Sequence, residues 1–203
     1  MINKDKASRS SLGTEDDVST GNEALNMLKE IFENINRWLQ FAEAKHGALI
    51  GINGLFLFKS VDYIFGLLEE VGVNVLILWL MTAVFFSAIL ISLKSFFPNT
   101  DVCKDKVNSS DDDDSHSDRV LVFYEDIRKY ESSLLYLRDI YKHYLGTKIN
   151  INDLKKIEVD YAKEIFTNSK ITSYKYKYFK LAVKLNIMAI IIFIVFLITS
   201  IKQ

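Results

Sequence analysis

Long apolar runs dominate the pattern of hydrophobic and polar positions along the chain. The run over 73–93 contains no charged residue, and the run over 181–201 contains only Lys184. A helix needs about 20 apolar residues to cross about 30 Å of hydrocarbon, so both runs predict transmembrane helices. A third transmembrane helix is predicted over 46–68, where an apolar run ends among a few polar residues.

Lys59 and Asp62 are the charged residues of that third run, and they lie three positions apart. On a helix they would share one face and could pair with each other. One interpretation ends the span near them and places both at the outer interface. The other places them along a polar path through an assembly, because ionisable residues inside membranes tend to be functional.

Outside these runs, apolar residues recur with helical spacing in three stripes. The first stripe predicts an amphipathic helix over 21–45, and the other two fall in a second helical region over 120–180. Three such stripes can close one helical bundle. Their members are Leu25, Leu28, Phe32, Ile35, Leu39 and Ala42, then Leu134, Leu137, Tyr141 and Tyr144, then Leu154, Ile157, Tyr161 and Ile165. Between Asn150 and Ile201 there is no Gly or Pro, so the last helix is expected to continue into its span.

Two polar segments are predicted to be unstructured, because they contain too few apolar residues to offset the entropy of ordering. They are an N-terminal tail over 1–20 and residues 100–119 of an acidic linker over 94–119. The linker contains the run Asp111 to Asp114, but it lacks the spaced ligands and the glycine of an EF-hand loop. No calcium site is therefore predicted there.

Composition narrows the fold class. The chain has 203 residues with one cysteine, one proline and eight glycines, so it cannot form an internal disulfide and has few helix breakers. A net charge of −1 gives no general attraction to nucleic acid. The prediction is an all-α membrane protein with three transmembrane helices and a cytosolic helical bundle.

The positions of charged residues predict an orientation. Arg37 and Lys45 precede the first span and several lysines precede the third, whereas Glu69 and Glu70 lie between the first two spans. Basic residues near spans favour the cytosolic side. The amino terminus and residues 94–180 are therefore expected to be cytosolic, with the carboxyl terminus outside.

No arrangement of residues indicates catalysis. His46, His116 and His143 lie apart, without the cysteines or carboxylates that zinc or a nucleophile with its base would need. We therefore expect a protein that is not an enzyme and that has no metal or cofactor.

Small residues recur every three or four positions at the start of the first predicted span. Gly47, Gly51 and Gly54 would lie close together on one helix face. This pattern predicts a close helix contact in the membrane, either within one chain or between chains.

Tyrosines and lysines alternate over 173–180, just before the third span. One interpretation is an interfacial belt, with tyrosines at headgroup level and lysines near anionic lipid. The alternative is that some of these residues face the bundle and hold a nucleotide, with a ring stacked on the base and a lysine near the phosphate.

Three motifs resemble those of the Pycsar effector transmembrane family. They are Leu39-Gln-Phe-Ala-Glu-Ala-Lys45 with Asn53-Gly54 after it, Phe123-Tyr-Glu-Asp-Ile127, and Asn168-Ser-Lys-Ile-Thr-Ser-Tyr-Lys175. Their order and their spacing to the spans match over about 24–203. One departure is Glu43, where the family usually has Asp.

The resemblance implies a bacterial anti-phage effector in the inner membrane. A partner pyrimidine cyclase would make cyclic CMP or cyclic UMP on infection, and the effector, as a homo-oligomer, would sense the nucleotide and impair the lipid bilayer, causing abortive infection. The motif residues that we take as candidates for nucleotide binding or coupling are Glu43, Lys45, Asp126, Asn168, Ser169 and Lys175. A different class remains open, namely a membrane-anchored helical scaffold that recruits a protein partner.

Glu43 lies at the cytosolic end of the first predicted span, where a carboxylate near lipid phosphates should be costly unless it is paired. Lys175 is a plausible partner from the last motif. The alternative is that Glu43 pairs in the neighbourhood of Lys45 or stays hydrated.

Overall fold

The computed structural model describes residues 5–66, 72–97, 119–150 and 153–201. Within these residues every secondary-structure element is a helix. The all-α prediction is confirmed. The helices are α1 (Asp5–Gly66), α2 (Val73–Lys94), α3 (Tyr124–Ile127), α4 (Ser133–Tyr144) and α5 (Lys156–Ile201). Three of them, α1, α2 and α5, are long and apolar enough to cross a membrane, as predicted.

Two boundaries of the predicted organisation change. α1 begins at Asp5, so the prediction of an unstructured tail over 1–20 is wrong for 5–20. Extending a nucleated helix adds one hydrogen bond for each residue fixed, and no proline interrupts this stretch. α1 also continues without a break from the predicted amphipathic helix into the first span. Most of the predicted acidic linker lies outside the described residues.

The chain divides into two compact units. The first unit comprises Met1–Trp38 and Asp101–Ile171, and the second comprises Leu39–Thr100 and Thr172–Gln203. α1 and α5 contribute residues to both units, whereas α2 belongs to the second and α3 and α4 belong to the first.

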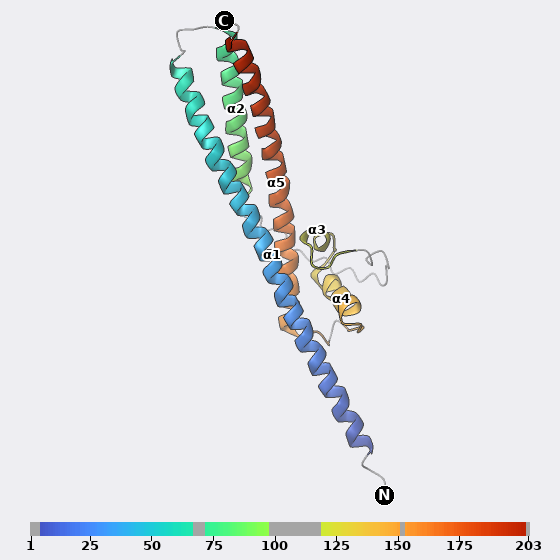
Figure 1. The fold of residues 1–203 in the computed structure, drawn as a ribbon. Coiled ribbons are helices and arrows are strands. Elements are labelled where there is room, and N and C mark those ends of the chain that lie inside the picture. The colour runs from blue at the N-terminus through green and yellow to red at the C-terminus, as the bar shows by residue number, and fades with distance from the viewer. Residues whose placement is uncertain (1–4, 67–71, 98–118, 151–152, 202–203) are drawn as a thin grey trace. The chain divides into compact units, whose positions relative to one another are not determined.

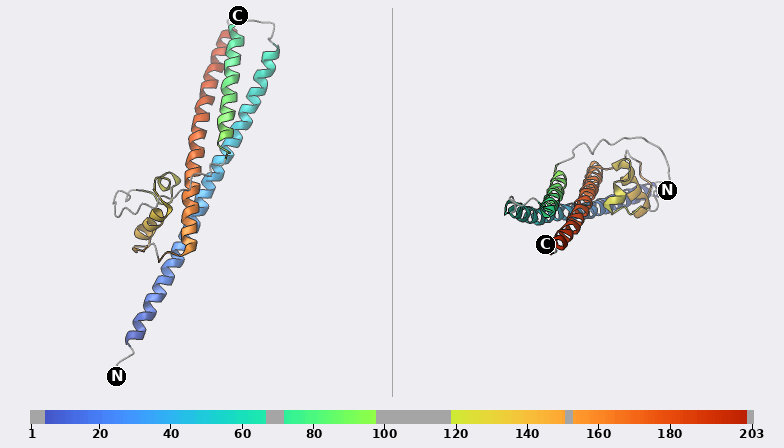
Figure 2. Two further views of the ribbon diagram at one scale, coloured as in Figure 1. Left: turned by 180° about the vertical axis from the view of Figure 1, so that it is seen from behind. Right: turned by 90° about the horizontal axis from the view of Figure 1, so that it is seen from above.

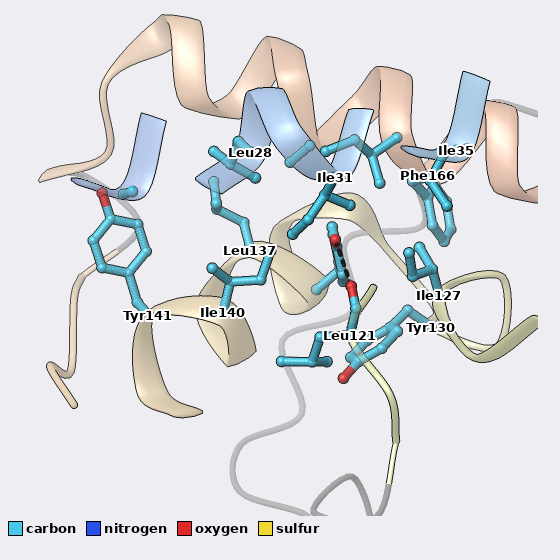
Figure 3. Close-up of a cluster of buried hydrophobic side chains, with 14 residues drawn as sticks. Leu28, Ile31, Ile35, Leu121, Ile127, Tyr130, Leu137, Ile140, Tyr141 and Phe166 are labelled. Atoms are coloured by element: carbon cyan, nitrogen blue, oxygen red, sulfur yellow. Dashed lines mark hydrogen bonds between the residues drawn. The ribbon is translucent and has the colours of Figure 1, made fainter. Parts of the chain in front are cut away.

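The first unit has an apolar core built from α1, α3, α4, α5 and the segment before α3 (Figure 3). Its buried members are Ala24, Leu28, Ile31, Ile35, Leu121, Ile127, Tyr130, Tyr136, Leu137, Ile140, Tyr141, Ala162, Ile165 and Phe166. Steps of three and four between the α1 members place them on one helix face. The predicted bundle of three stripes is therefore present in this unit.

All three stripes differ from the prediction in detail. On α1, Leu25 and Phe32 are only partly buried, and the predicted members Leu39 and Ala42 belong to the second unit. Tyr144 is 44% exposed and Ile157 is 48% exposed, although both were expected in the core.

On α5 the buried face includes Glu158 in place of Ile157. Glu158 can be buried because its carboxylate accepts hydrogen bonds from the Tyr141 hydroxyl (3.0 Å) and the Lys155 amide (3.2 Å). The spacing of apolar residues cannot predict the burial of Glu158, because this burial depends on hydrogen bonds from polar groups.

In the second unit, the parts of α1, α2 and α5 that it contains lie side by side (Figures 1 and 2). Stacked rings of Phe56 on α1 and Phe85 on α2, with centroids 5.2 Å apart, mark their register. Tyr63 on α1 meets Phe196 on α5 edge to face, at 6.4 Å. Most large apolar side chains of this unit point outward, as expected for helices that contact lipid.

The predicted glycine contact is not made among the residues that the structure describes. A Cβ atom added at Gly47, Gly51 or Gly54 would meet none of their atoms within 4 Å. The other alternative, a contact between chains, stays a prediction.

Candidate functional site

Lys175 on α5 joins the three helices of the second unit. Its side chain is buried, and Nζ lies 3.1 Å from Oε1 of Glu43 on α1. Nζ also donates a hydrogen bond to the carbonyl oxygen of Ser95, the residue that caps the carboxyl end of α2, at 3.2 Å. Of the two alternatives that the sequence left open for Glu43, the structure contains the ion pair with Lys175.

The end of α2 is suited to a cation. The last carbonyl groups of a helix have no partner within the helix, and the helix dipole places partial negative charge there. The ammonium of Lys175 meets this end and also lies over the ring of Phe96, 5.2 Å from its centroid. Glu43 supplies the full counter-charge from a side chain that is 46% exposed, so the pair is partly hydrated.

His46 forms a second link between α1 and α5. The side chain is fully buried, and Nε2 lies 3.0 Å from the carbonyl oxygen of Lys175. The imidazole packs edge to face against Phe96 and Phe179, with centroids 6.1 and 5.6 Å away. Sequence reasoning gave His46 no role, although a histidine at the start of the first predicted span was a signal that could have identified it.

Lysines and aromatic rings surround this junction. Lys45 Nζ lies over the rings of Tyr176 and Phe179, 5.2 and 5.5 Å from their centroids. Lys94 of α2 lies over Tyr178, at 5.6 Å. The aromatic residues of 173–180 thus contact lysines from neighbouring helices. This arrangement favours the interfacial-belt interpretation of the segment.

Several buried polar side chains continue from the junction along the second unit. Asn53 lies seven residues after His46, two turns further on the same face of α1, and Ser92 lies one turn before Ser95 on α2. In the described part of the chain, the side-chain amide of Asn53 and the hydroxyl of Ser92 have no hydrogen-bond partner. We call the following set the polar seam: His46, Asn53, Ser92, Ser95, Thr172 and Lys175.

The polar seam was largely missed by sequence reasoning. Asn53 was quoted as a motif residue without a role, and Ser92 and Thr172 were not singled out. Serine and threonine are common in membrane helices, where they usually donate to the carbonyl four residues earlier, as Ser60 and Thr82 do here. The sequence alone does not distinguish Ser60 and Thr82 from the serines and threonine of the polar seam. The arrangement of the helices is needed to tell them apart.

The remaining candidate residues lie in the first unit. Asn168 on α5 donates a hydrogen bond from Nδ2 to Oδ1 of Asn36 on α1, at 2.9 Å. Ser169 beside it is fully buried. These two residues therefore lie at the contact of α1 with α5 in the first unit.

Asp126 lies in α3 and closes a local turn. Its carboxylate accepts hydrogen bonds from Lys129 Nζ (2.6 Å) and from the Val120 amide (3.3 Å). The hydrogen bond from Lys129 lowers the pKa of Asp126 and keeps it ionised at neutral pH. The candidate residues thus divide into a group around Lys175, the Asn168 contact and this turn.

These features define a class: an α-helical membrane protein in which one unit has an apolar core and the other combines lipid-facing helices with buried polar groups. Comparison with known families is more specific. The chain belongs to the family of the Pycsar effector protein domain, which matches residues 27–201. The match covers two of the candidate spans completely, the first from residue 27 onward, and most of the helical bundle, so the resemblance seen in the sequence motifs is confirmed. Neither the curated proteins nor the solved structures give a significant match to the chain.

Proposed function

We propose that this membrane protein is the effector of a Pycsar anti-phage system, which senses cyclic CMP or cyclic UMP and impairs the bacterial inner membrane. A partner pyrimidine cyclase supplies the nucleotide on infection, and loss of the membrane barrier stops growth before the phage matures. The family match over residues 27–201 carries this proposal, because it includes both a bundle that can bind a ligand and the spans that can act on the bilayer. The protein acts without catalysis.

Coupling between sensing and membrane action requires two arrangements with different ligand affinity. Changing their populations from 1:99 to 99:1 takes a difference of about 5.5 kcal/mol. One monoanionic nucleotide supplies part of this, and several sites in a homo-oligomer supply the rest. The open face at Gly47, Gly51 and Gly54 suits such an assembly, because no described atom lies within 4 Å of a Cβ added there.

Each unit has a contact between α1 and α5 that lies close in sequence to the residues where these helices pass into the other unit. These contacts suit the coupling. Glu43 and Lys175 join α1 to α5 in the second unit, and Asn36 and Asn168 join the same two helices in the first. A change in either contact requires the two helices to move relative to each other. We assign Glu43 and Lys175 to coupling on this basis.

The basic residues near the spans support an orientation with the amino terminus and residues 94–180 in the cytosol and the carboxyl terminus outside. Cys103, the single cysteine, is a natural reporter. It should resist an impermeant thiol reagent in intact cells, whereas a cysteine added after Gln203 in a Cys103→Ser chain should react. The reverse labelling pattern would contradict the orientation.

The function is tested with the purified full chain in liposomes that contain a self-quenching dye. Cyclic CMP or cyclic UMP should release the dye, whereas cyclic AMP and cyclic GMP should not. If no cyclic nucleotide binds and none releases dye, the effector proposal is wrong, and the scaffold alternative gains support from a protein partner that binds the bundle.

A further inference from the structure

A groove of 420 Å³ lies against α1 in the first unit. One face of α1 from Met27 to Arg37 lines it, together with Val122 and with Tyr144 at the end of α4. Small-molecule sites have volumes of about 300–1,000 Å³, so the groove is of a size for one small ligand. None of the candidate residues from the sequence motifs lines it.

Arg37 is the one permanent cation among the lining residues. Its side chain is exposed, and it forms no ion pair within the part of the chain that the structure describes. A guanidinium presents paired donors that match two oxygens of a phosphate. The groove therefore offers a site for a singly charged phosphodiester.

Tyr144 gives the groove an aromatic surface. The sequence pattern placed this residue in the core, but its side chain is 44% exposed and lines the groove. Stacking on an aromatic ring is a general way to hold a nucleobase. Met27, also on the lining, adds a polarizable apolar contact.

Hydrogen-bond acceptors also lie along this face of α1, with Glu30 toward its other end and Asn34 between Glu30 and Arg37. Glu30 precedes Arg37 by seven residues, which is about 10 Å along a helix, and within the described structure it forms no ion pair. Asn34 donates from Nδ2 to the carbonyl oxygen of Val122 (3.3 Å), which leaves its side-chain oxygen as an acceptor. A pyrimidine edge donates through the amino group of cytosine or the N3–H of uracil. The base edge and the phosphate lie at opposite ends of a nucleotide. Glu30 and Arg37 are likewise seven residues apart on this face of α1, so they can meet the two ends.

We propose that this groove is the binding site for the cyclic pyrimidine nucleotide, an inference that rests on the proposed function. Arg37 holds the cyclic phosphate, Tyr144 stacks on the base, and Glu30 with Asn34 accepts hydrogen bonds from the base edge. Binding then occurs in the first unit, and Lys175 in the second unit acts in coupling. The two roles are separable by mutation.

The test measures binding of cyclic CMP and cyclic UMP to the full chain in nanodiscs by titration calorimetry. Arg37→Gln removes a charged hydrogen-bond donor and should weaken binding about tenfold or more. Tyr144→Ala should weaken it by a similar factor, whereas Tyr144→Phe keeps the ring and should bind nearly as the wild type does. Lys29→Gln removes an exposed cation of α1 outside the groove and serves as the matched control.

The outcomes separate the site from the function. If the wild type binds the nucleotide and releases dye, but Arg37→Gln and Tyr144→Ala both bind with unchanged affinity, the groove is not the binding site. The proposed effector function would still stand. Absence of nucleotide binding to the wild type would overturn both. Should either variant fail to fold, a photoreactive azido derivative of the nucleotide must label the α1 or α4 peptides of the wild type, and labelling elsewhere would refute the site. Lys175→Ala should bind the nucleotide normally yet release less dye.

Discussion

The two units of this protein differ in where most of their large apolar side chains lie, although the second also buries a small apolar cluster of Ile64, Leu78, Met81, Val84, Phe85 and Ala189. In the first unit, residues such as Leu28, Ile35 and Leu137 are buried together in an apolar core. In the second unit, large apolar side chains such as Leu55 and Trp79 point outward. Water drives apolar groups inward, but lipid solvates them as well as a protein core does. Apolar burial thus contributes far less to helix association in the second unit, and polar and small residues contribute more.

Buried polar groups with and without hydrogen-bond partners occur in both units. In the first unit, Tyr130 donates to Asp139 (2.8 Å) and Tyr136 donates to the Leu121 carbonyl (2.9 Å, dashed in Figure 3). Burial and the bond to Asp139 raise the pKa of Tyr130, so its hydroxyl stays protonated. Among the described residues, Asn53 and Ser92 are buried without partners in the second unit, as are the Glu158 Oε1 atom and the Ser169 hydroxyl in the first. Groups of this kind favour a change of state in which water or another chain satisfies them.

The largest expected effect contrasts two leucines. Leu137→Ala in the core of the first unit should lower the free energy of unfolding by about 2–5 kcal/mol, because it leaves a cavity. Leu55→Ala should change it little, since Leu55 is 71% exposed on the second unit. Denaturant unfolding in detergent micelles measures both. Equal losses would show that the two units are packed alike.

The next effect concerns the charge pair of the second unit. Glu43→Gln leaves the buried ammonium of Lys175 without a counter-charge and should cost about 1–2 kcal/mol, less than for a fully buried pair because Glu43 is half-exposed. Nucleotide-dependent dye release should fall as well. Glu43→Asp keeps the charge and is the matched control. Equal behaviour of the Gln and Asp variants would argue against a role for the charge.

A smaller effect is expected at the glycine face of α1, formed by Gly47, Gly51 and Gly54, which we propose packs against a second chain. Gly51→Leu should leave the stability of one chain unchanged, because the position is open. It should weaken self-association several-fold by keeping two backbones apart. Crosslinking in liposomes measures this. If the wild type and the variant form the same oligomers, the glycine face does not mediate self-association.

The smallest effect compares two serines of α2. Ser92→Ala removes a buried hydroxyl without a partner in the described structure and should raise stability by up to about 1 kcal/mol. Ser87→Ala removes an exposed hydroxyl that donates to the Ala83 carbonyl (2.8 Å) and should have almost no effect. A loss of stability in Ser92→Ala would show that its hydroxyl has a partner in the membrane.

Local patterns predicted the helical class and the three spans, because each depends on the composition of one continuous segment. The pairing of Glu43 with Lys175 was predictable for a different reason, since a charge at the membrane boundary needs a partner. The groove beside Arg37 was not predictable, because it depends on how Val122 and Tyr144 pack against α1. The start of α1 was also missed, since residues 5–20 extend a helix that forms further along the chain.

The central claim is that nucleotide binding in the first unit controls the membrane through helices that belong to both units. α5 passes from one unit to the other between Ile171 and Thr172. Replacing Ser173 and Tyr174 by two glycines should loosen the helix there, at a cost of about 1–2 kcal/mol relative to two alanines. Both variants lose the same side-chain contacts, so the comparison isolates backbone freedom.

The decisive measurement is binding and dye release in the same liposomes for these two variants. We expect both to bind cyclic CMP or cyclic UMP equally, with dye release retained in the alanine variant and abolished in the glycine variant. Equal nucleotide-dependent dye release from the two variants would contradict control through a continuous α5.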